Sequence, residues 1–301
     1  MAIRLGPVIE SWTTVAPLGV ALYDLVTDAR IVEGLRLTAQ PVDGGKVTAA
    51  FQTVSGAYAF RSLDRMRHVE MPEEPRADGP PVTRDFVVGV SDTRATFLDT
   101  AFVVPVPTDG LVSHGTVFGP ASPPSSPPVG ELPLYLFSAP SRVFPSHVGV
   151  VRAQLADAAT RTLAAHAVLE VTTNPGTASA RRFTGVADAQ GAVAVPIHYP
   201  RFAIPLGSLG SPPDPGTRGQ PPADRTWPVE IRARFDPTAQ EVIAALTVPT
   251  IQSIVIQSFV DVWATASASA PQVSDDLQFG QDLILRTGGD PDSYLLIGSS
   301  P

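Results

Sequence analysis

The segment from residue 149 to residue 195 limits the possible fold more than any other part of the chain. It alternates short apolar runs with turn sequences, among them Asp157-Ala-Ala-Thr160 and Asn174-Pro-Gly176. Asp188-Ala-Gln-Gly191 marks a further turn, because Asp can bond its own backbone two residues on and Gly takes positive φ without steric cost. The pattern predicts a succession of strands and turns, and the short apolar run at 192–195 suits a buried strand.

The order of these pieces resembles the carboxypeptidase-regulatory-like (prealbumin-like) β-sandwich domain. In that family a strand ending in Asp leads through a short loop to a strand with a small apolar run, and then to a turn of the type Thr-Asp-x-x-Gly. Here Asp157, the run 167–169 and the turn 188–191 occupy those places. Such domains are mostly non-catalytic spacers, so the resemblance implies an architecture rather than a reaction.

Composition supports an all-β chain with more than one domain. The 301 residues, 44% of them hydrophobic, can bury a sizeable core, and the length suggests two domains. The 32 prolines and 24 glycines favour many short strands joined by turns, and long helices should be scarce. We therefore expect two β-sandwich (Ig-like or prealbumin-like) domains joined by a proline-rich linker, with one short helix.

The N-terminal part contains a weaker copy of the central pattern. Residues 19–28 parallel 149–157, residues 34–39 parallel 167–172, and residues 55–60 parallel 190–195. We interpret this as an internal duplication.

The predicted organisation has four parts. An N-terminal sandwich covers 1–118, a Pro/Ser-rich linker covers 119–133, a carboxypeptidase-regulatory-like sandwich covers 134–270, and a docking tail covers 271–301. The linker prolines favour an extended, semi-rigid spacer that joins neither a ladder nor a helix.

Two further segments carry local signals for a particular element. Residues 227–236 alternate, which predicts a strand with Val229, Ile231, Ala233 and Phe235 on one face. The next segment, 236–246, offers Asp as an N-cap and proline at the first helical position, so the short helix is predicted there.

Charge and cysteine content exclude several functions. A net charge of −8 argues against nucleic acid and anionic membranes, which need basic patches. The absence of cysteine excludes disulfides, thiol catalysis and thiolate metal sites. Residues 1–7 show no charged head followed by an apolar segment, and no apolar run is long enough to span a bilayer. We expect a cytoplasmic protein without membrane insertion.

Candidate catalytic and metal-binding residues have simpler interpretations. The five histidines (His68, His114, His147, His166 and His198) lack the spacing of a helical metal pair, although His166 and His198 could approach in space. Ser146-His147 has no nucleophile elbow. Glu70, Glu73 and Glu74 could be paired carboxylates for acid–base catalysis, but a solvated charge cluster in a loop-like context is the simpler interpretation. Asp275-Asp276 and Asp290-Pro-Asp292 could offer oxygen to calcium, but turn-forming aspartates are the simpler interpretation. We expect no catalysis, no cofactor and no metal.

The tail carries more apolar surface than a disordered terminus would, so it should be buried on its own domain or on a partner. The candidate interaction residues are Leu277, Phe279, Leu283, Leu285, Tyr294 and Leu296.

Segments 134–145, 149–195, the strand start at Trp227 and 279–287 together look similar to proteins encoded with phage-tail-like contractile injection particles. This resemblance implies a structural cap, collar or baseplate accessory, assembled in the cytoplasm. Its expected partners are sheath, tube, cap or baseplate subunits, or further copies of itself in a ring. The alternative is a surface adhesin or carbohydrate-binding sandwich, which predicts export and an exposed aromatic platform.

Overall fold

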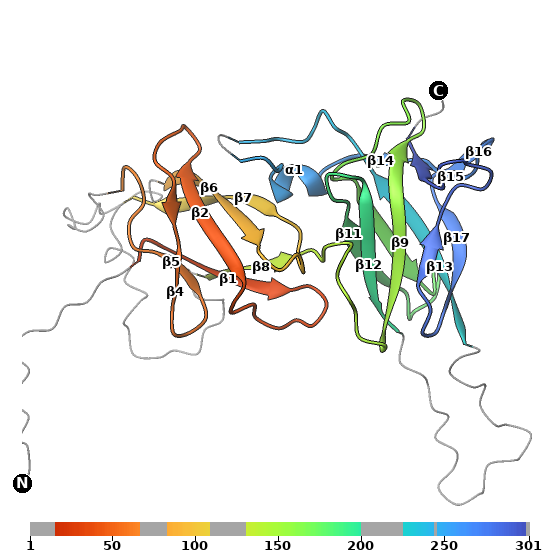
Figure 1. Ribbon diagram of the computed structural model, residues 1–301, viewed down its shortest axis with the longest axis horizontal. Coiled ribbons are helices and arrows are strands. Elements are labelled where there is room, and N and C mark those ends of the chain that lie inside the picture. Colours follow the sequence, from red (N-terminus) through yellow and green to blue (C-terminus); the bar gives the residue numbers. More distant parts are fainter. Residues whose placement is uncertain (1–15, 67–82, 109–130, 200–224, 244–245, 299–301) are drawn as a thin grey trace, which may run out of the picture.

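The computed structural model describes residues 16–66, 83–108, 131–199, 225–243 and 246–298. Within these ranges the chain is nearly all β and forms two sandwiches, seen as two lobes in Figure 1. The fold class predicted from the sequence, two β-sandwiches with one short helix, is therefore confirmed. No helix in the described part of the chain is long and apolar enough to cross a membrane.

The N-terminal sandwich is built from two sheets of four strands each, within the described residues. One sheet has the order β4–β5–β1–β8 and the other the order β3–β2–β6–β7. Their bounds are β1 Leu18–Asp24, β2 Leu35–Pro41, β3 Thr48–Ala49, β4 Phe51–Gln52, β5 Tyr58–Phe60, β6 Thr83–Asp92, β7 Thr100–Pro107 and β8 Glu131–Leu136.

The C-terminal sandwich has one sheet with the order β11–β10–β13–β14, in which β17 also pairs with β13. Its second sheet has the order β12–β9–β19–β15–β16, in which β18 also pairs with β9. The bounds are β9 Val148–Asp157, β10 Val168–Thr173, β11 Arg181–Val186, β12 Ala192–His198, β13 Thr226–Arg234, β14 Phe259–Val260, β15 Val262–Thr265, β16 Ala268–Ala270, β17 Val273–Gln278, β18 Leu283–Leu285 and β19 Leu295–Ile297.

The two sandwiches share one strand plan. In the first, β1 lies between an antiparallel partner, β5, and a parallel partner, β8. In the second, β9 lies between antiparallel β12 and the parallel strands β18 and β19. The second strands correspond too, since β2 pairs with β6 as β10 pairs with β13. The segments matched in the sequence fall on equivalent strands, as an internal duplication predicts.

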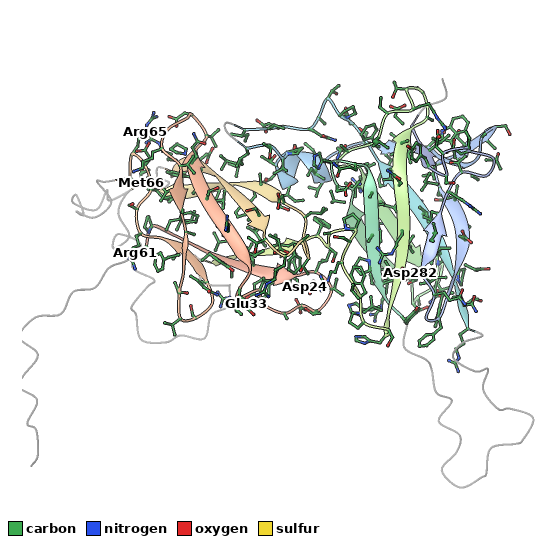
Figure 2. All side chains as sticks on the ribbon, viewed as in Figure 1. Asp24, Glu33, Arg61, Arg65, Met66 and Asp282 are labelled. Carbon is green, nitrogen blue, oxygen red and sulfur yellow. The ribbon has the colours of Figure 1, made fainter. Side chains whose placement is uncertain are left out.

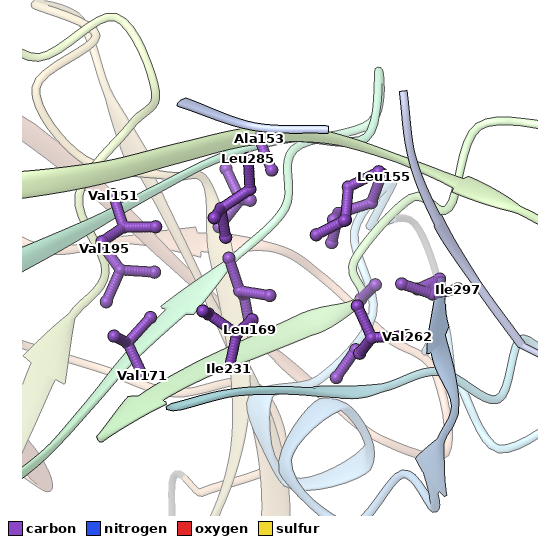
Figure 3. Packing of buried hydrophobic residues seen from close by; sticks show 14 of the residues in the cluster. Val151, Ala153, Leu155, Leu169, Val171, Val195, Ile231, Val262, Leu285 and Ile297 are labelled. Carbon is purple, nitrogen blue, oxygen red and sulfur yellow. The ribbon is translucent and has the colours of Figure 1, made fainter. Parts of the chain in front are cut away.

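Alternating apolar residues fill the C-terminal core, shown in Figure 3. The prediction for β13 is confirmed, because Val229, Ile231 and Ala233 are fully buried. Phe235 follows the strand and packs against the same core while remaining partly exposed. Val151, Leu155, Val168 and Val193 are buried as well.

The turn at 188–191 has the chemistry expected from its sequence. The Asp188 carboxylate accepts the backbone N–H of Gln190 at 2.8 Å and of Ala192 at 2.9 Å. Gly191 has a φ of 72°, and a Cβ there would lie 2.5 Å from the carbonyl oxygen of Leu155. A larger residue would therefore both strain this turn and push it off β9.

The end of the first sandwich differs from the predicted boundary. Most of the linker predicted at 119–133 lies outside the described residues, but β8 begins at Glu131 and pairs in parallel with β1. The boundary drawn between 133 and 134 therefore falls inside a strand of the first sandwich. The sequence placed residue 134 at the start of the second sandwich, but a sequence pattern does not name the neighbour with which a strand pairs.

The tail predicted as a docking segment, 271–301, is part of its own sandwich as far as residue 298. Strand β17 pairs with β13, and β18 and β19 pair with β9. Burial of these apolar residues was expected from the sequence, and the structure assigns it to the parent sandwich.

The helix is not where the sequence placed it. The Asp236 carboxylate accepts the backbone N–H groups of Thr238 and Ala239, as an N-cap would, but a turn follows and the described residues to 243 are not helical. The only helix in the described residues is α1, Ile251–Val255, whose N-cap Thr250 accepts the N–H of Ser253. Tertiary contacts, rather than the local capping signal at Asp236, decide where this five-residue helix forms.

Candidate functional site at the junction of the two sandwiches

The chain passes from the first sandwich to the second through the loop 137–147, between β8 and β9. We call this loop and the surfaces that it joins the junction. Figure 2 shows Asp24 at the end of the first sandwich that faces the second, whereas Arg65 and Met66 lie at its far end. The junction holds the most deeply buried ion pair of the described residues.

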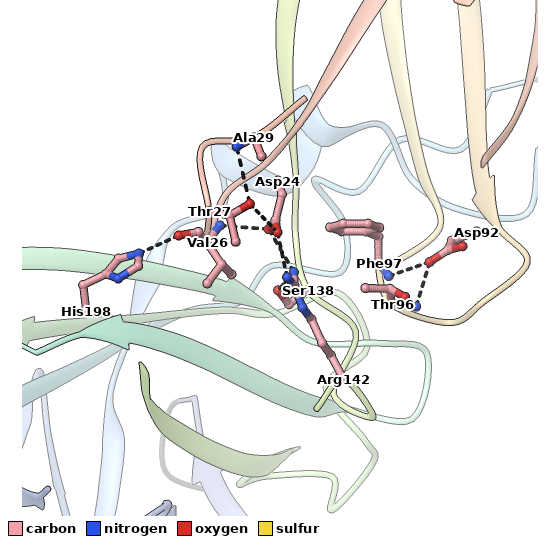
Figure 4. A network of polar contacts seen from close by, with 10 residues as sticks. All are labelled: Asp24, Val26, Thr27, Ala29, Asp92, Thr96, Phe97, Ser138, Arg142 and His198. Carbon is pink, nitrogen blue, oxygen red and sulfur yellow. Dashed lines mark hydrogen bonds and ion pairs between the residues drawn. The ribbon is translucent and has the colours of Figure 1, made fainter. Parts of the chain in front are cut away.

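Arg142 and Asp24 form the centre of the junction (Figure 4). The guanidinium donates to Asp24 through Nη1 at 2.9 Å and Nη2 at 2.6 Å, and the two side chains are only 11% and 8% exposed. Nη1 also donates to the Ser138 hydroxyl at 3.0 Å. The guanidinium lies 5.1 Å from the ring centre of Phe97 and 5.3 Å from that of Phe144. This geometry is specific, because a bidentate pair between two rings tolerates little rotation.

The first sandwich prepares Asp24 for this contact. Asp24 ends β1, and its carboxylate accepts the backbone N–H of Val26 and the hydroxyl of Thr27, both at 2.9 Å. Burial by itself raises the pKa of this carboxyl, but the hydrogen bonds from Arg142, Val26 and Thr27 outweigh it and lower the pKa below its ordinary value of 3.8. Asp24 is thus held ionised as the partner of Arg142.

A second arginine fixes the loop to the C-terminal sandwich. Arg152, on β9, donates to the Pro140 carbonyl at 2.6 Å and to the Asp282 carboxylate at 2.7 Å. Its guanidinium also faces the Phe144 ring at 5.8 Å. The loop is therefore tied to both sandwiches by charged hydrogen bonds.

Helix α1 closes the other side of the junction, between the two lobes in Figure 1. Thr250 forms a parallel bridge with Ala101 of β7, and Gln252 exchanges two hydrogen bonds with the backbone of Val103, at 3.1 and 3.3 Å. Two small apolar clusters cover these contacts. One contains Val87, Ala101 and Ile243, and the other contains Val168, Val186 and Ile254 with Leu98, Phe137 and Ile251 against them.

Two of the cavities that flank the junction are lined by residues of both sandwiches. The larger, about 540 Å³, lies between the loop at Leu25 and Val26 and the strands β10, β11 and β12. The smaller, about 320 Å³, lies between the loop after β6 and the turn at 188–191. His198 donates from Nε2 to the carbonyl oxygen of Val26 at 2.5 Å beside the larger cavity, and His166 lines the smaller one. The two histidines that could have met therefore line different cavities.

Glu170 is the buried charge of the larger cavity. Its Oε1 accepts from Arg234 at 2.9 Å, and its Oε2 faces Arg182 at 3.6 Å, which is too long for a hydrogen bond. The Glu170 side chain is 8% exposed, and Oε2 has no hydrogen-bond partner among the described residues. Such an atom is uncommon, because buried polar atoms are nearly always satisfied.

The structure places the predicted tail residues in three environments. Leu277 and Leu285 are buried in the C-terminal core, and Leu296 is buried beside Trp263 with Tyr294 packed against it. Leu283 is partly buried against the core. Phe279 stacks on Tyr199 with ring centres 4.8 Å apart, next to Trp227. A contact of these side chains with a partner would require the tail to leave its own sandwich, so their docking role stays a prediction.

Two of the four candidate calcium ligands, Asp290 and Asp292, have other roles. Asp290 accepts from Arg161 and from the backbone N–H of Tyr294, and Asp292 pairs with Arg161 at 3.0 Å. No group of three or more His, Asp or Glu side chains that could hold a metal ion occurs within the described ranges. His68, His114, Glu70, Glu73 and Glu74 lie outside those ranges.

Sequence reasoning did not find Asp24, Arg142 or Glu170. Asp24 and Arg142 are isolated charges 118 residues apart, and nothing in the pattern links them. Glu170 did leave a signal, since it is the one charged residue in the apolar run 167–171. A carboxylate in the middle of a buried strand requires a partner.

Comparisons with known proteins add little to this geometry. No protein-family model matches the chain, and no curated protein sequence matches it. Among solved structures, the Bacillus anthracis TIE protein is 9% identical with a TM-score of 0.23, over 92% of this chain and 34% of its own. A candidate adhesin from Bacteroides ovatus is 11% identical with a TM-score of 0.23, over 95% and 94% of the two chains. The shaft pilin SpaA from Lactobacillus rhamnosus GG is 9% identical with a TM-score of 0.22, over 94% and 97%.

The chain spans about a third of the TIE protein and nearly the full length of the other two. At these TM-scores none of the three carries an inference about function. None is described as part of a contractile injection particle.

Proposed function

We propose that this chain is a non-catalytic structural protein that holds two β-sandwiches in a fixed orientation and acts by docking on other proteins. Its docking surface would be formed by both sandwiches together, and the loop 137–147 would be the rigid element between them. No cofactor or metal is needed for such a role.

The observation that carries the proposal is the buried Arg142–Asp24 pair. Two sandwiches on a flexible tether would need no contact across the junction, and burying a charge without a partner is costly. Here an arginine from the connecting loop is bonded through two nitrogen atoms to a carboxylate of the first sandwich, and Arg152 anchors the same loop to the second. A fixed orientation is what a part of a larger assembly requires, because its contacts must be made in register.

The assembly that we propose is the contractile injection particle implied by the sequence resemblance. The partners would be sheath, tube, cap or baseplate subunits, or further copies of this chain in a ring, and assembly would take place in the cytoplasm. The alternative is a surface adhesin or a carbohydrate-binding protein. The aromatic group Tyr199, Trp227 and Phe279 favours a carbohydrate platform only weakly, because Trp227 is just 8% exposed.

Rigidity can be tested with spin labels, since the chain contains no cysteine. Ala49→Cys on β3 and Ala268→Cys on β16 place one label on an exposed position of each sandwich. We expect a single narrow distance distribution, which Arg142→Ala should broaden. The matched control is Arg94→Ala, which removes an exposed pair with Glu33 at 3.2 Å and should change nothing. A broad distribution in the unsubstituted chain would contradict the proposal.

The assembly in which the chain acts can be tested by purifying the protein from native cells and identifying what accompanies it by mass spectrometry. Sheath, tube or baseplate subunits in constant ratio would support the particle. Envelope polysaccharide or outer-surface proteins would support the adhesin instead.

A further inference from the structure

The larger junction cavity has the features of a ligand site. Its volume of about 540 Å³ lies within the range of small-molecule and peptide pockets, roughly 300–1,000 Å³. Apolar side chains from both sandwiches line it, namely Leu25, Val26, Phe137, Val168, Phe183 and Val255. Both sandwiches are needed to form it, so the fixed orientation described above also fixes the cavity.

The cavity has one charged end. Glu170, Arg182 and Arg234 line it together, so two guanidinium groups face one carboxylate and leave an excess of positive charge. Arg234 is bonded to Glu170 and is 24% exposed, whereas Arg182 is 61% exposed and, within the described part of the chain, forms only the 3.6 Å ion pair. Arg182 therefore keeps most of its N–H donors for a ligand.

The hydrogen-bonding and packing requirements of these groups define the ligand. The buried Oε2 of Glu170 needs a hydrogen-bond donor, Arg182 offers donors to an anionic acceptor, and the walls require an apolar group. A cation would be repelled by the two arginines, and a simple anion such as phosphate would leave the apolar walls uncovered. The end of a polypeptide supplies all three groups within one residue: an amide N–H, a carboxylate and a side chain.

The strand at the rim suits an extended chain. Arg182, Phe183 and Thr184 all line the cavity although they are consecutive on β11. By register, Arg182 and Thr184 share one face of the sheet with Glu170, Val168 and Arg234, whereas Phe183 belongs to the other face, so the cavity lies over the first face and extends around the edge of β11. β11 is the last strand of its sheet, and the edge of such a strand offers backbone N–H and C=O groups to an added strand.

We infer that this cavity binds the C-terminal end of a polypeptide whose last side chain is apolar. The terminal carboxylate lies against Arg182, an amide N–H near the terminus donates to Glu170 Oε2, and the last side chain contacts Phe137, Val26 and Val255. The residues before it extend along the edge of β11. The inference gives a class of partner for the proposed docking function, and rests on that function only for its biological meaning.

The test uses the purified full-length chain and a library of hexapeptides that carry a fluorescent group on the N-terminus and have free or amidated C-termini, measured by fluorescence anisotropy. We expect free peptides ending in Leu, Val or Phe to bind, and their amidated forms to bind at least about tenfold more weakly, which is the usual loss for a hydrogen bond to a charged group. Amide chemical shifts of Thr184 and Val26 should move on binding.

Arg182→Gln should weaken binding of the free peptide by a similar factor and leave the amidated peptide unaffected. Arg181→Gln is the matched control, because Arg181 is its exposed neighbour on β11 and does not line the cavity. Equal binding of free and amidated peptides, equal effects of the two variants, or no binding of any free peptide would overturn the inference. So would a preference for an acidic monosaccharide over every peptide.

The two proposals fail separately. A chain that co-purifies with particle subunits but binds no peptide loses this inference and keeps the proposed function. A chain that binds free C-termini in solution but accompanies no assembly keeps the inference and loses that function.

Discussion

The two sandwiches share one arrangement of strands. They differ in the segment that pairs in parallel with β1 in the first sandwich and with β9 in the second, and so closes the sandwich. In the first, the parallel strand beside β1 is β8, six residues long, and the chain continues from it directly into the junction. In the second, the place beside β9 is taken by two strands of three residues each, β18 and β19, which come from the tail. The first sandwich is thus closed by the segment that connects it, and the second by the last described part of the chain.

This difference predicts how each sandwich responds when its closing strand is disturbed. Because β8 and the junction loop are continuous, disturbing the junction should also disturb the closing strand of the first sandwich. The second sandwich depends instead on the tail, whose apolar residues complete its core. Four experiments can break or sharpen this comparison.

Deletion of residues 275–301 should have the largest effect. It removes Leu277, Leu285, Leu295 and Ile297, none more than 5% exposed, together with both parallel partners of β9. Each buried leucine-sized side chain contributes about 2–5 kcal/mol, so the second sandwich should not fold. Solubility and near-UV circular dichroism would measure this, with deletion of 299–301 as the control. A truncated protein that folds and stays monomeric would restore the tail as an independent docking arm.

Arg142→Ala should come second. Removing one member of a buried ion pair leaves Asp24 without its partner, and the expected loss is about 3–5 kcal/mol in the free energy of unfolding. Urea denaturation would measure it, and Arg94→Ala should change the same quantity by less than about 0.5 kcal/mol, since that pair is exposed. Equal effects of the two variants would show that the junction does not stabilise the first sandwich.

Ile231→Ala and Phe235→Ala should show whether a residue at the centre of the C-terminal core contributes more stability than one at its edge. Ile231 is fully buried on β13, so its truncation should cost about 2–5 kcal/mol. Phe235 has the larger side chain, but it is only partly buried beyond the end of the strand, so its truncation should cost less than the roughly 3–5 kcal/mol of a core phenylalanine. Thermal unfolding would compare the two, and a larger loss for Phe235→Ala would contradict the assigned facing.

The smallest expected effect is the loss, in acid, of the stability that Asp24 contributes. The pKa of Asp24 is lower in the folded protein than its ordinary value of 3.8, so its stabilising contribution is present above that value and is lost as the pH falls through the lower, folded pKa. The difference in unfolding midpoint between the unsubstituted chain and Asp24→Asn should therefore be constant near neutral pH and narrow below about pH 4. A difference that stays constant down to strongly acidic pH would remove Asp24 from the acid response. Asp43→Asn, in an exposed pair with Arg65, is the control.

Much of the fold can be predicted from the sequence because its signals are local. The turn at 188–191 needs only the chemistry of Asp188 and Gly191, and the facing of β13 follows from alternate apolar residues. The duplicated pattern also gave the equivalent strands of the two sandwiches. The all-β architecture follows from these periods and from the density of proline and glycine.

The junction could not be predicted in the same way. Arg142 and Asp24 are ordinary charged residues in sequence, and only the closure of β8 beside β1 brings them within 2.6 Å. The misplaced helix has the same cause: Asp236 carries a good capping signal, yet the cooperative cost of a short helix leaves the choice to packing, which favours α1 against β7.

The sequence by itself determined the strands, the turns and which face of each strand is apolar, because these depend on neighbours within a few residues. Tertiary structure alone decided which strands pair, where the tail lies and that Glu170 keeps an unsatisfied oxygen beside a cavity. Pairing and burial depend on contacts between residues far apart in the chain, and such contacts form only when the whole sandwich closes.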